Sequence, residues 1–410
     1  MMGPLLADKN NCTGCTACMS VCPCNAITMQ EDDYGFLYPV ISKDCNECNL
    51  CNSICPVLNS RDDETIINET YAAYAKSGDI LKTSSSGGVF ALLATEVLKD
   101  DGIVYGCAQI NDFSAVHVRV VDEIALNSLK GSKYIQSNLN DIFRHVESDL
   151  NAGKKVLFSG TPCQVLGLKA YLGREYNNLI TVDLVCHGVT SRKIFFDYLK
   201  WFEDKYKCKI LEYIFRDTKK KGMRCDSRMV VVTNKGKKKT FITYYHSKFY
   251  FYYLYMFGYI YRESCYKCPC LPNKRVSDIT LGDYWGVELI IPEWVDVKGV
   301  SLCIIHSKKG SKLFDSIDAI KTSVDYDISI IHNTSVKESV VKPEARCEIW
   351  DRVLNADSEG IYNICKRLIG KSQFIIFIKH LIPLQFKRRI QALLYGKMHL
   401  NVKYDFKGER

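Results

Sequence analysis

Eight cysteines near the start of the chain are spaced in two identical runs, and this repeat constrains the fold more than any other feature. The runs are Cys12-x2-Cys15-x2-Cys18-x3-Cys22 and Cys45-x2-Cys48-x2-Cys51-x3-Cys55. A proline, Pro23 or Pro56, follows each run directly. Sulfur ligands at such short, repeated intervals indicate that the segment folds around metal or around cross-links between the sulfurs.

The spacing is typical of bacterial ferredoxins, in which four cysteines hold each of two 4Fe–4S clusters. Three thiolates of a run bind one cluster, and the fourth reaches the other cluster. We therefore predict a first cluster and a second cluster with these ligands: Cys12, Cys15, Cys18 and Cys55; Cys45, Cys48, Cys51 and Cys22. Zinc sites or disulfides are the alternatives, but zinc does not need a third Cys-x2-Cys step in each run.

Length, charge and hydropathy limit the remaining possibilities. At 410 residues the chain exceeds one typical core. Of its 55 Lys and Arg residues, 11 lie between Lys366 and Arg410, so the net charge of +9 is concentrated there and a nucleic-acid-binding face is not expected. No signal peptide and no apolar run of membrane-spanning length is recognisable, so we expect a cytoplasmic protein.

Two polar loops are candidate sites for an anionic cofactor. The loop from Thr83 to Gly88 is rich in Ser and Gly and precedes a predicted helix, Val89–Leu98. Backbone N–H groups at such a helix start suit a phosphate, although ordinary serine capping explains the pattern equally well. The second loop, Lys130–Ser137, can embrace an anionic, planar cofactor or can be an exposed basic loop. No GxGxxG motif supports a conventional dinucleotide site.

Two predicted strand-to-helix units indicate a parallel α/β sheet with ligands at its C-terminal edge. In the first, Val156–Phe158 leads to Thr161 as N-cap, Pro162 as the first helical residue and Cys163 in the first turn, where the helix dipole favours thiolate. In the second, a strand ends at Cys186-His187-Gly188. For His187 we favour a contact with a cofactor over proton donation or a structural role.

A further cysteine pair makes a third metal centre possible. Cys265-x2-Cys268 supplies two thiolates, to which Cys163 and Cys186 can add two more. These four thiolates predict a third 4Fe–4S cluster, with Cys270 as the substitute ligand. Zinc bound by the same residues is the alternative, and Cys163 as a thiol nucleophile or redox switch is another.

The motifs in this order resemble the coenzyme F-420 hydrogenase/dehydrogenase beta-subunit family over roughly residues 10 to 310. The motifs that carry the resemblance are the double cysteine run, Ser-Ser-Gly-Gly, Gly-Ser-Lys-Tyr-x-Gln-Ser, Ser-Gly-Thr-Pro-Cys-Gln, Cys-His-Gly, Ser-Cys-x-x-Cys and Asp-Ile-Thr-x-Gly-Asp-x-Trp-Gly. The resemblance implies a flavoprotein that binds FAD and at least one 4Fe–4S cluster. Its candidate FAD-site residues, to which we add His187, are Ser85, Ser86, Gly87, Gly88, Lys133, Tyr134, Gln136, Ser137 and Thr161.

The resulting fold class combines α+β and α/β: a two-cluster ferredoxin module, a mixed α/β flavin-binding domain and a basic helical tail. The expected divisions are 1–60 for the ferredoxin domain, 70–150 for an N-terminal α/β region, 151–350 for the FAD and iron–sulfur domain, and 351–410 for the tail. The tail has apolar residues beside a basic face, so we expect either peripheral contact with the inner face of an anionic membrane or docking on protein.

The predicted function is an FAD- and 4Fe–4S-dependent oxidoreductase that relays electrons to or from a small organic substrate. A deazaflavin coenzyme and a surface-polysaccharide precursor are candidate substrates through the family resemblance. The expected partners are a redox protein or ferredoxin, within an oligomer. The alternative is an electron-transfer subunit that serves a separate catalytic protein and has no substrate of its own. No acid or base residue is identified as catalytic.

Overall fold

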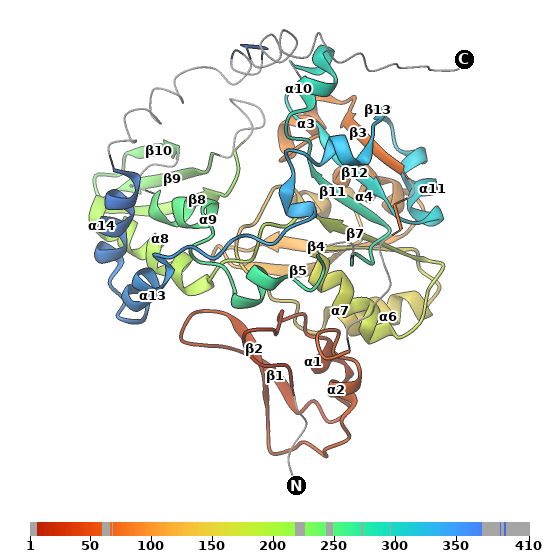
Figure 1. Ribbon diagram of the computed structural model, residues 1–410, viewed down its shortest axis with the longest axis horizontal. Helices are drawn as coiled ribbons and strands as arrows, with labels where there is room; N and C mark the ends of the chain where they lie inside the picture. Colours follow the sequence, from red (N-terminus) through yellow and green to blue (C-terminus); the bar gives the residue numbers. More distant parts are fainter. Residues whose placement is uncertain are drawn as a thin grey trace.

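The computed structural model describes residues 6–59, 66–67, 69–217, 226–242, 249–271, 274–295, 297–370, 386 and 389–390. It contains a small N-terminal module, a large mixed sheet covered by helices on both faces, and a lobe rich in aromatic residues (Figure 1). The predicted class, a ferredoxin-like module followed by a mixed α/β domain, is thereby confirmed. Most of the predicted tail lies outside the described residues.

The N-terminal module, residues 6–59, pairs two short helices with a hairpin. Its elements are α1 (Ala17–Val21), β1 (Ile27–Glu31), β2 (Leu37–Ile41) and α2 (Leu50–Ser53). Gly35, at the hairpin tip, has φ 80°, and a side chain there would come within 2.4 Å of the Lys193 Cβ. The tip therefore needs glycine for its conformation and for its close approach to the lobe. The Ser191 hydroxyl donates to the Tyr34 carbonyl over 2.6 Å and holds the tip in place.

The large sheet has eight strands in the described residues, in the order β13-β3-β12-β11-β7-β6-β4-β5. Their bounds are β3 (Glu69–Ala75), β4 (Ile103–Gln109), β5 (Ala115–Val120), β6 (Val156–Gly160), β7 (Leu179–Leu184), β11 (Ile279–Asp283), β12 (Ser301–Ile305) and β13 (Ala319–Ser323). Strands β4, β6, β7 and β11 run parallel, while the outer pairings are antiparallel. The parallel arrangement predicted from the two strand-to-helix units is thus the centre of a mixed sheet.

Helices cover both faces of this sheet because its central strands are apolar on both sides. One face packs on α4 (Val89–Lys99), α5 (Glu123–Leu126) and α11 (Lys308–Ser316); the other packs on α6 (Ile142–Asn151) and α7 (Pro162–Leu172). Strand β4 shows the alternation, since Val104 packs on the first side and Tyr105 on the second. Shorter helical turns join the strands: α3 (Gly78–Thr83), η1 (Asn127–Leu129), α10 (Val287–Ile290), η4 (Pro292–Trp294), α12 (Tyr326–Ser329) and η5 (Thr334–Val336).

The aromatic lobe packs a three-stranded antiparallel sheet against helices. Its elements are α8 (Arg192–Tyr206), β8 (Cys208–Ile214), β9 (Arg228–Thr233), β10 (Lys238–Ile242), α9 (Tyr250–Met256), η3 (Glu263–Lys267), α13 (Arg346–Leu354) and α14 (Ser358–Ile369). The core is formed by rings such as Tyr198 and Tyr250, whose centroids lie 4.9 Å apart. The apolar segment Phe249–Ile260, predicted to be a buried helix, contains α9, and most of its rings are buried.

Two predictions concern boundaries that the structure does not decide. Regions 70–150 and 151–350 share one sheet, since β4 lies between β5 and β6; the division between them stays a prediction. The membrane-binding face predicted for the tail falls after residue 370, outside the described residues apart from 386, 389 and 390. Within the described part of the chain, no helix is long and apolar enough to cross a membrane.

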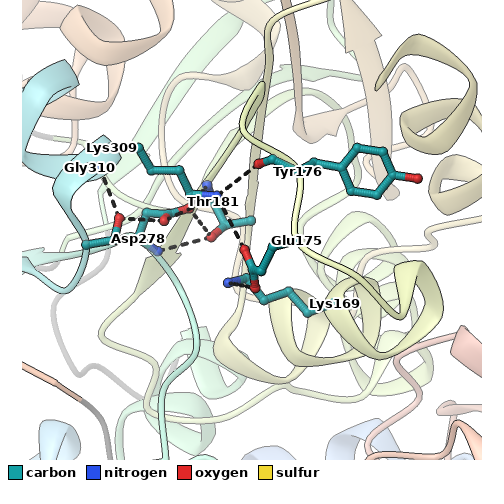
Figure 2. A network of polar contacts seen from close by, with 8 residues as sticks. Lys169, Glu175, Tyr176, Thr181, Asp278, Lys309 and Gly310 are labelled. Atoms are coloured by element: carbon teal, nitrogen blue, oxygen red, sulfur yellow. Dashed lines mark hydrogen bonds and ion pairs between the residues drawn. The ribbon is translucent and has the colours of Figure 1, made fainter. Parts of the chain in front are cut away.

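A buried carboxylate ties three elements together at the start of β11 (Figure 2). Asp278 is 2% exposed, and one of its oxygens accepts hydrogen bonds from the Thr181 N–H and hydroxyl at 2.7 and 2.8 Å. The other oxygen accepts from the Ser307 hydroxyl at 2.6 Å and lies 3.6 Å from the Lys309 ammonium. Asp278 thus joins β7, β11 and the first turn of α11.

We expect Asp278→Asn to lower the free energy of unfolding by about 2 kcal/mol, because an amide NH₂ would face donors at one of the two oxygen positions. Glu175→Gln is the matched control: Glu175 pairs with Lys169 and Lys309 in the same network, but its side chain is 72% exposed. The control should change stability by less than about 0.5 kcal/mol. Urea unfolding followed by circular dichroism measures both, and equal effects would contradict this account.

Candidate functional site

A cavity of about 610 Å³ opens at the C-terminal ends of the parallel strands. Ser159 and Gly160 of β6, Leu184 at the end of β7, and Asp283 of β11 form part of its wall. Its volume lies within the range of small-molecule and cofactor sites. The cavity therefore occupies the edge of the sheet at which parallel α/β proteins bind ligands.

The two polar loops singled out in the sequence meet in this cavity. The Ser132 N–H donates to the Ser85 hydroxyl over 2.9 Å, so the loops are joined directly. Helix α4 begins after Gly88, which has φ 81° and no side-chain cap, so serine capping does not explain the Ser-rich loop. All but one of the candidate FAD-site residues line the cavity: Ser85, Ser86, Gly88, Lys133, Tyr134, Gln136, Ser137, Thr161 and His187.

Gly87 is the exception, and its reason is structural. A side chain at Gly87 would come within 2.4 Å of the Ala73 carbonyl and 2.7 Å of the Ser301 N–H. The Gly87 N–H donates to the Ser301 hydroxyl over 3.1 Å. Gly87 is therefore glycine because the loop passes directly over β3 and β12.

Lys133 has its ammonium turned toward backbone carbonyls. Its Nζ donates to the carbonyls of Ser128, Leu129 and Lys130 over 3.0–3.1 Å. Burial lowers the pKa of Lys133 to about 8. The lysine thus fixes the loop around η1 and keeps a cationic group at the cavity wall, which suits an anionic ligand.

Four cysteines from three segments gather beside the cavity: Cys163, Cys186, Cys265 and Cys268, called the inner cysteines. Cys163 stands in the first turn of α7, after Thr161 as N-cap and Pro162 as the first helical residue, as predicted. Burial, followed by the neighbouring thiols of Cys265, Cys163 and Cys268, raises the pKa of Cys186 well above its usual value. The four thiols are therefore mutual neighbours.

One expectation about Cys163 is wrong. The helix dipole is expected to favour its thiolate, but burial and then the nearby Cys268 raise the pKa of Cys163 to about 11. Removal of the thiol from water outweighs the helix dipole, because burial penalises the charged form. An uncomplexed Cys163 is thus protonated at neutral pH, which disfavours a nucleophile.

Cys270 lies next to the inner cysteines and is 1% exposed. A hydrogen bond between its thiol and Cys268 lowers the pKa of Cys268 and raises that of Cys270 well above the usual range. This asymmetry favours Cys268 as the ligand and Cys270 as its hydrogen-bond donor. Among the described residues, no three Cys, His, Asp or Glu side chains are close enough to bind one metal ion. A four-iron cluster instead takes each thiolate at a separate corner.

The cysteines of the N-terminal module lie in the predicted crossed groups. Burial, followed by thiols that include Cys12 and Cys55, raises the pKa of Cys15 to about 12, and the same two neighbours act on Cys18. In the second group, burial and then Cys22 and Cys45 raise the pKa of Cys51. The fourth cysteine of each run is therefore beside the other run, as a two-cluster module requires. Cys48, the remaining predicted ligand, is exposed.

The module and the inner cysteines are in direct contact through α7. Gly167 of α7 leaves no room for a side chain, since a Cβ there would lie 2.9 Å from the Cys15 Sγ. Cys163, four residues earlier in α7, is itself among the thiols that raise the pKa of Cys15. Thr13 and Gly14, from the loop between Cys12 and Cys15, line the cavity. The first cysteine group thus faces both the inner cysteines and the cavity.

Several residues at the site were not identified from the sequence. His117 is 3% exposed and lines the cavity, and burial lowers its pKa to about 4. Its Nε2 lies 3.2 Å from the Ser159 carbonyl, so Nε2 carries the hydrogen and the buried Nδ1 is an acceptor with no hydrogen-bond partner among the described residues. An isolated histidine inside an alternating strand gives no sequence signal. The same is true of Cys107, which also lines the cavity.

A charged pair forms another part of the wall. Arg216 donates to the Asp283 carboxylate over 2.5 Å, and the guanidinium lies 5.6 Å from the centre of the Trp285 ring. His187 is nearby in the wall, and its Nδ1 lies 2.9 Å from the Ser335 hydroxyl. Asp283 and Trp285 belong to the Gly-Asp-x-Trp-Gly motif noted in the sequence, so this motif was the signal that could have identified them.

Comparisons with known proteins give two family matches and one solved structure. Residues 153–324 match the family described as the C terminus of the beta subunit of coenzyme F420 hydrogenase/dehydrogenase. Residues 11–59 match the 4Fe-4S dicluster domain. No curated protein matches the chain. A chain of the F420-reducing [NiFe] hydrogenase complex from Methanosarcina barkeri is 18% identical, with a TM-score of 0.42, and the match covers 75% of this chain and 92% of that one.

The two family matches cover the cysteine runs of the N-terminal module and the segment that contains all four inner cysteines. The chain therefore belongs to the coenzyme F420 hydrogenase/dehydrogenase beta-subunit family and carries a 4Fe-4S dicluster domain at its N-terminus.

Proposed function

We propose that this iron–sulfur protein is a flavin-dependent oxidoreductase with three 4Fe–4S clusters and one FAD. Electrons pass between the two clusters of the N-terminal module, a third cluster at the inner cysteines, and FAD in the cavity. A small organic substrate is oxidised or reduced at the flavin. The observation that carries the proposal is the cavity whose wall includes the first cluster loop, two inner cysteines and the polar loops.

The residues present fit both cofactors. For the inner cluster, the four thiols gather in a buried setting that supplies the thiolate ligands such a cluster requires. For FAD, the cavity offers the cation of Lys133, the Ser-rich loop at the start of α4 and the buried acceptor of His117. A helix start with free N–H groups favours a pyrophosphate.

When bound, FAD supplies the exchange between one-electron clusters and a two-electron organic substrate. The protein's own contribution is placement. Gln164 donates to the Ser137 hydroxyl over 2.9 Å and fixes the second loop against the start of α7. The Arg216–Asp283 pair presents charge to the cavity beside Trp285, so we propose that a polar substrate is held at this part of the wall.

The far end of the N-terminal module is the proposed contact for a redox partner. Cys48 and Leu50, both in or beside the second cysteine run, are exposed. The module projects from the body of the molecule in Figure 1. Electron exchange with a separate protein is favoured here because the second cysteine group is the one reached from solvent. The family itself names a subunit of a larger enzyme, which supports a partner protein.

The full proposal is tested by iron, sulfide and flavin quantification on anaerobically purified protein. We expect about twelve irons and one FAD per chain. About eight irons with FAD would remove the inner cluster from the proposal. Absence of flavin after reconstitution, with clusters intact, would leave an electron-transfer subunit without a substrate of its own.

Cys163→Ser should lower the iron content by about four per chain, because an inner cluster would lose one thiolate ligand. Cys107→Ser is the matched control, since Cys107 lines the same cavity but is not an inner cysteine. The control should keep its iron. Equal iron content in the two variants would contradict the ligand assignment of Cys163.

His117→Phe should weaken FAD binding about tenfold, because it removes the buried Nδ1 acceptor while keeping a ring in place of one that stacks on Phe158 at 5.7 Å. With a pKa near 4, His117 is neutral at pH 7, so its contribution is a hydrogen bond rather than a charge. His145→Phe, at an exposed position on α6, is the control. Titration of the flavin-free proteins with FAD measures the affinity; unchanged binding in His117→Phe would exclude the contact.

A further inference from the structure

Arg262 is a fully buried cation between the N-terminal module and the inner cysteines. Its side chain is 1% exposed, and its Nε donates to the Cys12 carbonyl over 2.7 Å. Its Nη1 donates to the Leu37 carbonyl over 3.0 Å, and the guanidinium lies 3.9 Å from the centre of the Tyr38 ring. Its main chain caps the turn η3 that carries Cys265.

The charge of Arg262 is not balanced by a carboxylate. No acidic side chain of the described residues forms an ion pair with it, although buried arginines such as Arg216 and Arg275 have Asp283 and Asp183. In addition, its Nη2 is buried without a hydrogen-bond partner in the described part of the chain. Burial of an unpaired charge costs several kcal/mol in general, and a buried N–H left unpaired adds to that cost. Such an arrangement is stable when an anion is close by.

The position of Arg262 identifies that anion. The guanidinium is close enough to the thiols of Cys163 and Cys265 to interact with them electrostatically. Arg262 precedes Cys265 by three residues, and the Cys265 N–H donates to the Arg262 carbonyl over 3.0 Å. A 4Fe–4S cluster with four thiolate ligands is a net anion whose sulfurs accept hydrogen bonds.

We propose that Arg262 donates its remaining N–H to a sulfur of the inner cluster and raises the reduction potential of that cluster. This inference rests on the proposed function, since it requires a cluster at the inner cysteines. When the first cluster loses one electron and the inner cluster gains it, the inner cluster becomes more negative by one charge. A fixed cation beside it stabilises the reduced state, because charge and hydrogen bonds at the sulfurs set cluster potentials.

The same side chain also couples the two cluster sites mechanically. Its bond to the Cys12 carbonyl fixes the loop that carries the ligands of the first cluster, and Gly14 in that loop approaches the Arg262 Nη1 so closely that a Cβ would lie 3.1 Å away. Arg262 therefore favours transfer from the module toward the cavity in two ways. It holds the first site against the inner one, and it lowers the energy of the electron at the inner site.

The test is a redox titration of Arg262→Gln and Arg262→Lys, followed by EPR of the purified, cluster-loaded proteins. The inner-cluster signal is the one missing from Cys163→Ser. We expect a lower potential for this signal in Arg262→Gln, and a smaller decrease in Arg262→Lys, which keeps the charge but loses the forked donor. If Arg262→Gln fails to fold, the lysine variant decides alone: a lowered potential supports the proposal and an unchanged one overturns it.

Arg144→Gln is the matched control. Arg144 also ties the module to the α/β domain through backbone carbonyls, those of Ser20 and Cys22, at 2.8 and 2.9 Å. Its loss should leave the inner-cluster potential unchanged. An equal decrease in this control would reduce Arg262 to a docking residue and overturn the proposal. Absence of any signal that Cys163→Ser removes would instead refute the inner cluster, and thus the proposed function itself.

Discussion

The close docking of the N-terminal module on α7 is the constraint on which the rest of the site depends. Gly167 allows the Cys15 loop to reach the helix backbone, and Arg262 holds the neighbouring Cys12 carbonyl from the other side. Without both contacts, the first cysteine group would lie farther from Cys163 and from the cavity. Electron transfer depends steeply on separation, so the packing of small and charged side chains here governs the proposed relay.

The sheet explains why the inner cysteines meet although they are spread over a long stretch of sequence. Cys163 follows β6 and Cys186 follows β7, and these strands are parallel neighbours, so their C-terminal ends lie together. Cys265 and Cys268 reach the same place through η3, which Arg262 anchors. The parallel centre of the sheet thus determines where the thiols gather, while the antiparallel outer strands complete the fold.

Local patterns in the sequence predicted much of this arrangement. The cysteine spacing indicated the crossed groups, and Thr161-Pro162 indicated the start of α7. What escaped prediction depends on long-range burial. The raised pKa of Cys163 and the lowered pKa of His117 come from water exclusion that no short motif reports. The role of Gly87 likewise depends on β3 and β12, whose contact with that loop no local pattern contains.

Strand β3 has a further consequence for how this chain folds. Ala73 pairs with Ser301 on one side and with Lys321 on the other, so both edges of an early strand are closed only by segments made more than two hundred residues later. During synthesis those edges remain open while most of the chain is still absent. Contacts of such high sequence separation slow folding, and open strand edges promote aggregation. Correct maturation of this protein therefore depends on protecting its first large strand until its last ones arrive.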